Sequence, residues 1–319
     1  MVFAYIHILN LIYLQFEYGV ANKPARTIVM SEVRPLQLRV IPKDTELKPC
    51  MVISWNVDGY TPDIHAWLLE LVRKASPDVI FLSETKKPLA TLEPLFKQFT
   101  NYNVIINVHQ PANWHGVAML IRKDHKYNRV AFPITIHPRS DCNAEDGCIG
   151  RVIAIHLDEQ LYIIGSYTPN SGRGGKHLEY RTAIWDPGFA TLLEILRATG
   201  PTMWVGDINV APDVIDMSSP KAMGSWSGCL PEERGNFHAL INTKNWIDIW
   251  RTQHPNERSY TWCGNPPRPN YGLRLDNIVV SSSLLPDMMN TFTLSECPIS
   301  ADHIPIGAYV QLKLPKSQK

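Results

Sequence analysis

The sequence predicts a single α/β domain that occupies nearly all of the chain after residue 50. Short apolar runs alternate with amphipathic helical patterns from residue 51 onward, as in a mixed α/β protein. This stretch holds no Pro/Gly/Ser-rich linker, and 319 residues with 45% hydrophobic content suffice for one large core. We therefore expect one domain over 50–315, a loosely ordered arm or upstream extension over 1–49 and a short tail over 316–319.

Each element follows from a local pattern. MVISWN (51–56) is an apolar run of strand length, and Thr61-Pro62 begins a helix because Pro favours the first helical position. This helix has its apolar stripe at Ile64, Trp67, Leu68, Leu71 and Val72. A second helix runs from Asp186-Pro187 to Gly200-Pro201, and a third lies near 231–243. The other apolar runs predict strands at 78–84, 103–108, 116–122, 130–136, 151–157, 161–167 and 203–209, and near 275–281, 290–295 and 306–312.

The N-terminal stretch fits neither a signal peptide nor a membrane span. Residues 1–21 are apolar, but they lack a basic start and are interrupted by His7, Asn10, Gln15 and Glu17. Met30 opens a more polar leader, so 1–29 reads as an upstream extension. We expect an intracellular protein, nuclear if the cell is eukaryotic, monomeric and without a membrane partner.

Charge and cysteine content restrict the function only weakly. The net charge is +1, from 31 basic and 30 acidic residues, which neither indicates nor excludes a nucleic-acid binder, since a local basic groove can exist on a neutral protein. Six scattered cysteines without a CxxC motif are typical of reduced intracellular thiols. A pairing or shared metal at Cys142 and Cys148 is the less favoured alternative.

Polar side chains follow the predicted strands at the points where those strands end. In MWVGDINVAP (203–212), Asp207 and Asn209 point the same way if the segment is a strand, and both residue types are poor strand formers. Taken singly, the asparagines also fit turn residues, and His303 fits an ordinary loop histidine. The repetition along the chain predicts one assembled site instead. Its candidates are Asn56, Asp58, Glu84, Tyr167, Asn170, Asp207, Asn209, Asp276, Asp302 and His303.

These residue types indicate metal-assisted hydrolysis of a phosphate ester. The chain has no GxSxG, GxGxxG or GxxxxGK[ST] motif. Carboxylates suit Mg²⁺, with Mn²⁺ as a substitute, because hard cations bind oxygen. Amides and a phenol suit phosphate oxygens, and a histidine beside an acid suits a protonated imidazole that faces an anion.

The chain resembles the exonuclease III class of apurinic/apyrimidinic (AP) endonucleases, within the endonuclease/exonuclease/phosphatase superfamily. The resemblance covers residues 51–314, and GDxN and DH alone would mark only the superfamily. The motifs that carry it are SWNVDG (54–59), SETK (83–86), GVAMLIR (116–122), GRVI (150–153), YTPNSGRG (167–174), LEYR with Trp185, GDINVAP with Ile215-Asp216, PEERGNF (231–237), SYTW (259–262), GLRLDN (272–277) and ADHIPI (301–306). It implies a four-layer α/β sandwich, two packed mixed β-sheets flanked by helices.

The resemblance also implies roles for individual residues. Asp207 matches the residue that activates or orients the attacking water. Asp276 matches the acid that orients the phosphate-binding imidazole of His303. The metal ligands implied are Glu84, with Asp58 in support, and Asp302 as a second carboxylate. Asn209 matches the amide partner of Asp207, and Tyr167 matches the phenol near the scissile phosphate. The groups implied to contact phosphate or DNA are Asn56, Asn170, Arg173 and Trp262. The implied substrate is double-stranded DNA with an abasic site, cut on its 5′ side, with 3′-phosphodiesterase or 3′–5′ exonuclease activity beside it.

The chain departs from the family pattern at positions that bear on substrate preference. Thr61 replaces a DNA-contacting arginine, and Trp226, Ser227 and Gly228 stand where an asparagine is expected. Leu273 replaces a tryptophan in the wall of the sugar pocket, and Trp262 replaces a phenylalanine there. Two other functions therefore stay open. One is the same centre acting on RNA 3′ ends, inositol phosphates or retroelement-type DNA targets, and the other is a non-catalytic DNA-binding relative.

Overall fold

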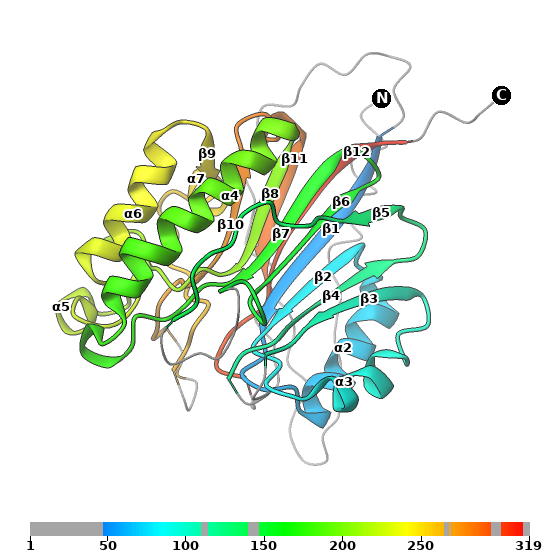
Figure 1. The fold of residues 1–319 in the computed structure, drawn as a ribbon, viewed down its shortest axis with the longest axis horizontal. Helices are drawn as coiled ribbons and strands as arrows, with labels where there is room; N and C mark the ends of the chain where they lie inside the picture. The colour runs from blue at the N-terminus through cyan, green and yellow to red at the C-terminus, as the bar shows by residue number, and fades with distance from the viewer. Residues whose placement is uncertain are drawn as a thin grey trace.

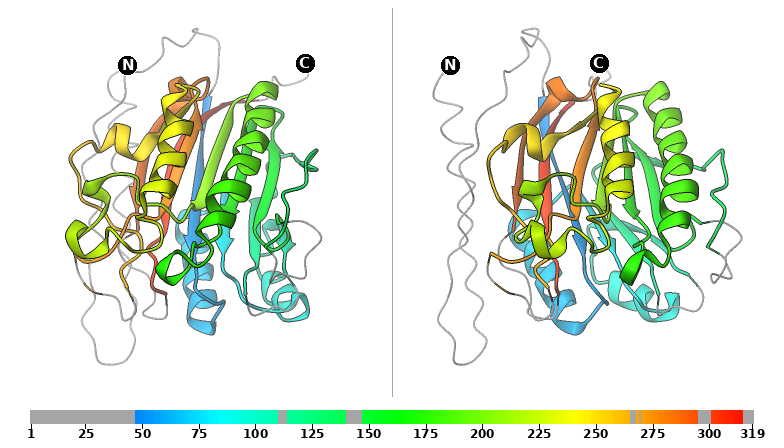
Figure 2. Two further views of the ribbon diagram at one scale, coloured as in Figure 1. Left: turned by 60° about the vertical axis from the view of Figure 1, so that its left-hand side comes forward. Right: turned by 90° about the vertical axis from the view of Figure 1, so that its left-hand side faces the viewer.

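Two six-stranded sheets lie face to face, and helices cover the outer face of each (Figures 1 and 2). The computed structural model describes residues 47–109, 114–139, 147–264, 268, 270–294 and 301–314. The strand orders are β11-β12-β1-β2-β4-β3 in the first sheet and β5-β6-β7-β8-β10-β9 in the second. The four-layer α/β sandwich is therefore confirmed. Cys142 and most of the expected N-terminal arm lie outside the described residues.

Both sheets are mixed, each with one parallel strand pair. The first sheet consists of β1 (Leu47–Asn56), β2 (Val79–Ser83), β3 (Tyr102–Asn107), β4 (Val117–Arg122), β11 (Met288–Thr293) and β12 (Ile306–Lys313). The second consists of β5 (Tyr127–Arg129), β6 (Val152–Leu157), β7 (Leu161–Tyr167), β8 (Thr202–Asp207), β9 (Trp246–Asp248) and β10 (Asp276–Ser281). β1 pairs in parallel with β2, β7 pairs in parallel with β8, and the other pairings are antiparallel.

The helices divide between the two outer faces. α2 (Pro62–Ala75) and α3 (Leu89–Phe96) cover the first sheet, and α4 (Asp186–Thr199) and α6 (Pro231–Asn242) cover the second (Figure 1). Shorter elements are α5 (Pro220–Met223), α7 (Ile249–Gln253), the 3₁₀ turns η1 (Arg173–Gly175), η3 (Val214–Asp216) and η4 (Leu285–Asp287), and the π-helix η2 (Tyr180–Trp185). No helix in the described part of the chain is long and apolar enough to cross a membrane.

Three apolar layers hold the sandwich together. The central layer fills the space between the sheets with strand residues such as Val52, Phe81, Val205 and Ile278, all nearly or fully buried. The outer layers pack α2 and α3 against the first sheet, and α4 and α6 against the second. Burial on both faces explains why the central strands read as continuous apolar runs rather than alternating ones.

A buried ion-pair network ties the end of β4 to its neighbours, away from the strand ends that carry the candidate residues. The His125 ring bonds through Nε2 to Asp78 Oδ1 and through Nδ1 to Asp158 Oδ2, both at 2.6 Å. Burial alone would lower the pKa of His125, but the two carboxylates outweigh it and the pKa is raised. The imidazole is therefore held in its charged form, with both nitrogens donating.

Two sequence predictions need correction. Residues 130–136 form no strand; β5 ends at Arg129, and only the Val130 N–H extends the pairing, to the Ala154 carbonyl. Pro133 has no N–H with which to continue the ladder, although Ile136 still packs against the outer layer. β1 begins at Leu47, four residues before the strand expected at 51–56, because its first residues pair with the end of β12.

Strand pairing brings the candidate residues to one edge of the sandwich. Asn56 at the end of β1 lies opposite Ser83 in β2, which Glu84 follows. Tyr167 at the end of β7 lies opposite Asp207 at the end of β8, and Asp276 at the start of antiparallel β10 also lies opposite Asp207. Parallel strands end at the same edge of a sheet, so polar residues far apart in sequence converge there.

Candidate active site

A pocket of about 280 Å³ opens at this shared edge and draws side chains from both sheets. Its polar lining comes from the loops that follow β1, β2, β7 and β8 and from the segment before β12. The lining residues are Asp58, Glu84, Tyr167, Asn170, Asp207, Asn209, Trp226, Ser227, Trp262, Leu273, Leu275, Asp302 and His303. Nine of these are among the predicted site residues. Two more predicted residues lie behind the lining, where Asn56 bonds to Asp207 and Asp276 to His303.

Asp207 lies at the centre of the site, and amide groups hold its carboxylate. Oδ1 accepts the backbone N–H of Asn209 at 2.9 Å, and Oδ2 accepts the side-chain amides of Asn56 at 2.9 Å and Asn209 at 3.3 Å. Burial and the nearby charge of Asp276 raise the pKa of Asp207 to about 8. Gly206 makes the position possible: its φ is +141°, and a Cβ there would lie 2.0 Å from the Ser166 carbonyl oxygen.

His303 forms a buried pair with Asp276. Nδ1 lies 2.6 Å from Asp276 Oδ2, and Nε2 points toward Asp207 and Asp302, 4.0 and 3.9 Å from their nearest carboxylate oxygens. Burial alone would lower the pKa of His303, but Asp276 and then the two other acids raise it to about 10. The ring is thus an imidazolium whose Nε2–H faces the pocket. Asp207, Asp276 and His303 are spaced closely enough to hold an ion, but this protonated ring between the two acids disfavours one.

Glu84, Asp58 and Asp302 supply further carboxylate oxygens to the pocket. Glu84 Oε1 accepts the Asn56 amide at 2.8 Å, while Lys86 Nζ lies 2.6 Å from Glu84 Oε2 and 2.5 Å from Asp58 Oδ1. Burial would raise the pKa of Glu84, yet Lys86 outweighs it and lowers that pKa, which keeps Glu84 ionised. The donor set consists of oxygens and carries excess negative charge, so it fits a hard divalent cation. Lys86 holds part of this set together.

The end of β7 brings a phenol to the pocket, and the loop after it brings an amide. Burial and the Glu84 charge raise the pKa of Tyr167 well above its usual value, so it stays a neutral donor. Asn170 donates to Asn209 Oδ1 at 3.0 Å. Arg173 stands in η1 beyond Asn170, exposed and outside the pocket lining. The structure therefore places Arg173 near the pocket but outside its lining, and the expected contact of Arg173 with DNA stays a prediction.

Four residues around the site have a left-handed backbone conformation. Asp58, Glu84, Lys86 and Asn209 all have positive φ, between 43° and 54°. Such conformations are uncommon for residues other than glycine and persist only where the surroundings enforce them. The backbone after β1, β2 and β8 is thus turned to aim these side chains into the pocket.

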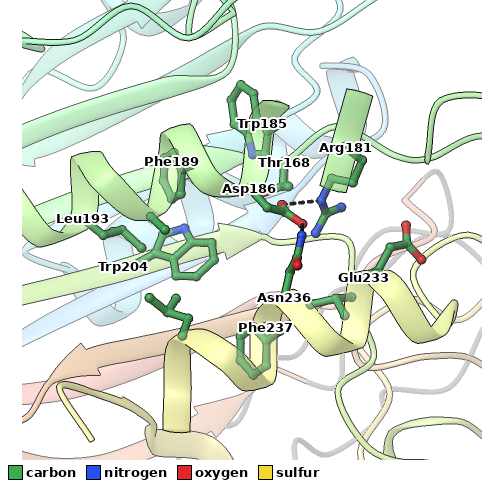
Figure 3. A pocket seen from close by; sticks show the side chains of 13 residues that line it. Thr168, Arg181, Trp185, Asp186, Phe189, Leu193, Trp204, Glu233, Asn236 and Phe237 are labelled. Atoms are coloured by element: carbon green, nitrogen blue, oxygen red, sulfur yellow. Dashed lines mark hydrogen bonds and ion pairs between the residues drawn. The ribbon is translucent and has the colours of Figure 1, made fainter. Parts of the chain in front are cut away.

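A buried arginine braces the loops that carry the site. Arg181, from the LEYR motif, bonds the carbonyls of Pro169, Ile208 and Asn209 at 2.8–3.1 Å and joins Asp186 at 2.7 Å. Figure 3 shows this pair, with the Asn236 amide on the same carboxylate, beside a cavity of about 40 Å³ between α4 and α6. Arg181 therefore fixes the loops after β7 and β8 relative to each other.

Sequence analysis missed three side chains that shape the site. Lys86, which the sequence does not single out, pairs with two carboxylates. Arg151 lies over the Tyr167 ring at 5.0 Å and donates to Nε2 of His115 at 2.9 Å. Trp226 joins the pocket wall. All three positions lie in or beside the family motifs, Lys86 in SETK, Arg151 in GRVI and Trp226 before PEERGNF. Their contacts are visible only in the fold.

Thr61 has a structural part in this fold. Its hydroxyl accepts the Ile64 N–H at 3.3 Å and caps the N-terminus of α2. At the position where the resemblance expects a DNA-contacting arginine, this chain therefore has a helix cap.

The pocket geometry agrees with the sequence comparisons. A family model described as "Endonuclease/Exonuclease/phosphatase family" matches residues 53–303. The chain belongs to this family. A DNA-(apurinic or apyrimidinic site) endonuclease of Dictyostelium discoideum is 36% identical over 267 residues, which are 82% of this chain and 70% of the relative. The DNA repair nuclease APEX1 of Danio rerio is 30% identical over 278 residues, 84% of each chain. The expected exonuclease III and AP endonuclease class is thereby confirmed.

Solved structures share the fold. An AP endonuclease from Leishmania major has a TM-score of 0.71 and 24% identity, with 88% of this chain and 93% of that chain covered. A 3′ phosphatase from Neisseria, bound to a product DNA hairpin, has a TM-score of 0.66 and 20% identity, with 82% and 99% covered. The family match and the nuclease relatives make this protein a hydrolase of the nuclease type, and these structures show the sandwich on which it is built.

Proposed function

We propose that this protein is a Mg²⁺-dependent DNA repair endonuclease that hydrolyses the phosphodiester on the 5′ side of an abasic site. The observation that carries the proposal is the pairing of a buried, amide-held carboxylate, Asp207, with the imidazolium of His303 in one pocket. The first suits activation of a water and the second suits binding of an anionic phosphate oxygen. The names of the Dictyostelium and Danio relatives support the abasic substrate.

The protein groups divide the work on the phosphate between them. Asp207, with its pKa raised to about 8, accepts the proton of the attacking water, and Asn56 and Asn209 hold its carboxylate in place. His303 Nε2–H and the Tyr167 hydroxyl donate to the phosphate oxygens, where negative charge grows in the transition state. Asp276 orients and charges the His303 ring through a 2.6 Å hydrogen bond.

The acidic side of the pocket would hold the metal ion. Glu84 is the principal ligand in this proposal, with Asp58 in support and Asp302 as a second carboxylate. Burial raises the pKa of Asp302. A hard cation held by these residues would supply positive charge to the phosphate that is hydrolysed. Mg²⁺ fits this oxygen set, with Mn²⁺ as a substitute.

Cleaning of DNA 3′ ends is the second activity we propose for the same pocket. Its support is the Neisseria structure of a 3′ phosphatase with product DNA, together with an exodeoxyribonuclease of Bacillus subtilis that is 27% identical and covers 82% of this chain and 99% of its own. Action as a monomer, on double-stranded DNA and in the nucleus of a eukaryotic cell remains part of the proposal.

One assay separates these possibilities. Purified protein is incubated with duplexes that contain an abasic analogue, with undamaged duplex, with RNA and with inositol phosphates, each in Mg²⁺ or EDTA. We expect the abasic duplex to be cut on the 5′ side of the abasic residue in Mg²⁺ and to stay intact in EDTA. Preferential hydrolysis of RNA or inositol phosphates would refute the assigned substrate, and binding of abasic duplex without any cleavage would refute the enzymatic function.

A further inference from the structure

A buried histidine and a buried arginine lie beside the phenol of the active-site pocket. His115 and Arg151 are each 7% exposed, and Arg151 Nη2 lies 2.9 Å from His115 Nε2. The guanidinium carbon of Arg151 lies 5.0 Å from the centre of the Tyr167 ring, and the centre of the His115 ring lies 6.0 Å from it. Neither His115 nor Arg151 lines the pocket, so both act on the substrate only through other residues.

The hydrogen bonds of His115 require a neutral ring. Its Nδ1 lies 2.6 Å from the Trp114 carbonyl oxygen, which can only accept, so Nδ1 carries the proton. Nε2 then has a free lone pair and accepts an N–H of Arg151, whose guanidinium has only donors. Burial, and after it the Arg151 charge, lowers the pKa of His115 to about 3. At neutral pH the ring is therefore a fixed acceptor for the guanidinium.

Arg151 holds Tyr167 through the backbone as well as through the ring. Arg151 Nη1 donates to the Tyr167 carbonyl at 3.2 Å, and the Tyr167 N–H donates to the Arg151 carbonyl at 2.8 Å. A cation over an aromatic face is attracted by the ring quadrupole, and more strongly where water is excluded. The guanidinium therefore fixes both the end of β7 and the position of the phenol ring that this strand carries.

The backbone around His115 joins this pair to the loop that carries Glu84. The Lys86 N–H donates to the His115 carbonyl at 2.8 Å, and the Thr85 N–H donates to the Gly116 carbonyl at 2.9 Å. Gly116 permits this close approach, because its φ is +101° and a Cβ there would lie 2.3 Å from the Thr85 hydroxyl oxygen. The segment around His115 therefore connects the phenol to the loop of the pocket carboxylates.

We propose that Arg151, held by the neutral ring of His115, is a positioning residue that fixes the Tyr167 hydroxyl for donation to the phosphate. The proposal rests on the endonuclease function proposed above, in which this hydroxyl donates where negative charge grows in the transition state. A displaced donor weakens the transition state more than the bound substrate, so the effect falls on kcat rather than on KM. A pair that only stabilised the fold would instead lower the free energy of unfolding, whether or not the hydroxyl were present.

The test is a double-mutant cycle on a duplex with an internal abasic analogue. His115→Leu removes the acceptor at similar volume, His115→Gln keeps one acceptor and one donor, and each is made with and without Tyr167→Phe. We expect His115→Leu to lower kcat by roughly 10- to 100-fold with KM nearly unchanged, and His115→Gln to restore most of the rate. With Tyr167→Phe present, His115→Leu should add little further loss. His156→Leu is the matched control and should cleave normally, because His156 stacks on Tyr162 outside the pocket lining.

A spectroscopic measurement keeps the positioning independent of cleavage. In protein labelled with 3-fluorotyrosine, the ¹⁹F signal that is missing from Tyr167→Phe reports the Tyr167 ring. We expect this signal to shift in His115→Leu, to return toward its wild-type position in His115→Gln and to stay in place in His156→Leu. Arg151→Lys keeps the charge without the planar fork, so it should also shift the signal and lower kcat. This variant carries the test if His115→Leu does not fold.

Three outcomes decide the matter. An unmoved ¹⁹F signal in both His115→Leu and Arg151→Lys would overturn the proposal, and so would an equal loss of kcat with and without the Tyr167 hydroxyl. If the signal shifts but the wild type never cuts the abasic duplex, the endonuclease function fails while the positioning of the ring by Arg151 stands.

Discussion

Replacing Asp207 with asparagine tests the assigned proton acceptor with little change of shape. The carboxylate accepts one backbone and two side-chain N–H groups, from Asn56 and Asn209, and it is only 2% exposed. In Asp207→Asn the oxygen can still accept the Asn209 N–H, while the new NH₂ group faces the two amide NH₂ groups. The volume is retained, so the sandwich should fold, but no group is left to take the water proton.

The expected loss in kcat is about 10²- to 10⁴-fold, the usual contribution of a general base, or about 3–5 kcal/mol of activation free energy. Single-turnover cleavage of an abasic duplex in Mg²⁺ measures it. Binding in Ca²⁺ and the thermal unfolding midpoint establish that the variant is folded. Asp63→Asn, the same chemical change on the exposed face of α2, is the matched control and should cleave normally. A rate for Asp207→Asn within a few-fold of that control would refute the role of Asp207.

Four further outcomes follow from the same geometry. Glu84→Ala should raise the Mg²⁺ concentration for half-maximal cleavage, since a hard oxygen ligand is lost; an unchanged titration curve contradicts this. A pH profile of kcat/KM should rise toward about pH 8 as Asp207 deprotonates and fall above about pH 10 as His303 loses its proton, with the acidic limb moving lower as Mg²⁺ increases. The pKa of His125 is raised in the folded state. The stabilisation that protonated His125 gives is therefore full below its unfolded pKa of about 6.5 and is lost as the pH rises through the raised pKa. Urea unfolding should show this decline in the wild type and not in His125→Gln. Thr61→Ala should lower the free energy of unfolding by about 1 kcal/mol through loss of the cap, with Thr61→Ser near wild type.

Much of the fold could be predicted because its signals are local. The helix after Thr61-Pro62 has its cap, its proline and its apolar stripe within one segment, and the structure confirms α2 there. The expected strand at 130–136 was wrong because alternating apolar residues also describe an irregular segment that packs on a core, and Pro133 ends the ladder. Local pattern predicts burial more reliably than it predicts strand pairing.

The residues of the site were predictable as a group, but their interactions were not. Asp207, Asp276 and His303 lie in motifs at strand ends, and the sheet register then brings them together. The sequence did not identify Lys86 and Trp226 as site residues, because their contacts are with residues distant in the chain. Lys86 contacts Asp58, and Trp226 contacts Trp262. A lysine beside an acid reads as solvated, and a lone tryptophan in a loop has no periodic context.

The central claim is that water, held by Asp207, adds to the phosphate on the 5′ side of an abasic residue. Cleavage in ¹⁸O-labelled water, followed by mass spectrometry of both fragments, tests it most directly. Hydrolysis at this bond predicts one ¹⁸O atom in the 5′ phosphate of the fragment that begins with the abasic sugar. The upstream fragment should end in an unlabelled 3′ hydroxyl. Cleavage that leaves an unsaturated sugar on the 3′ end and no label in either phosphate would mean elimination, and would contradict the account.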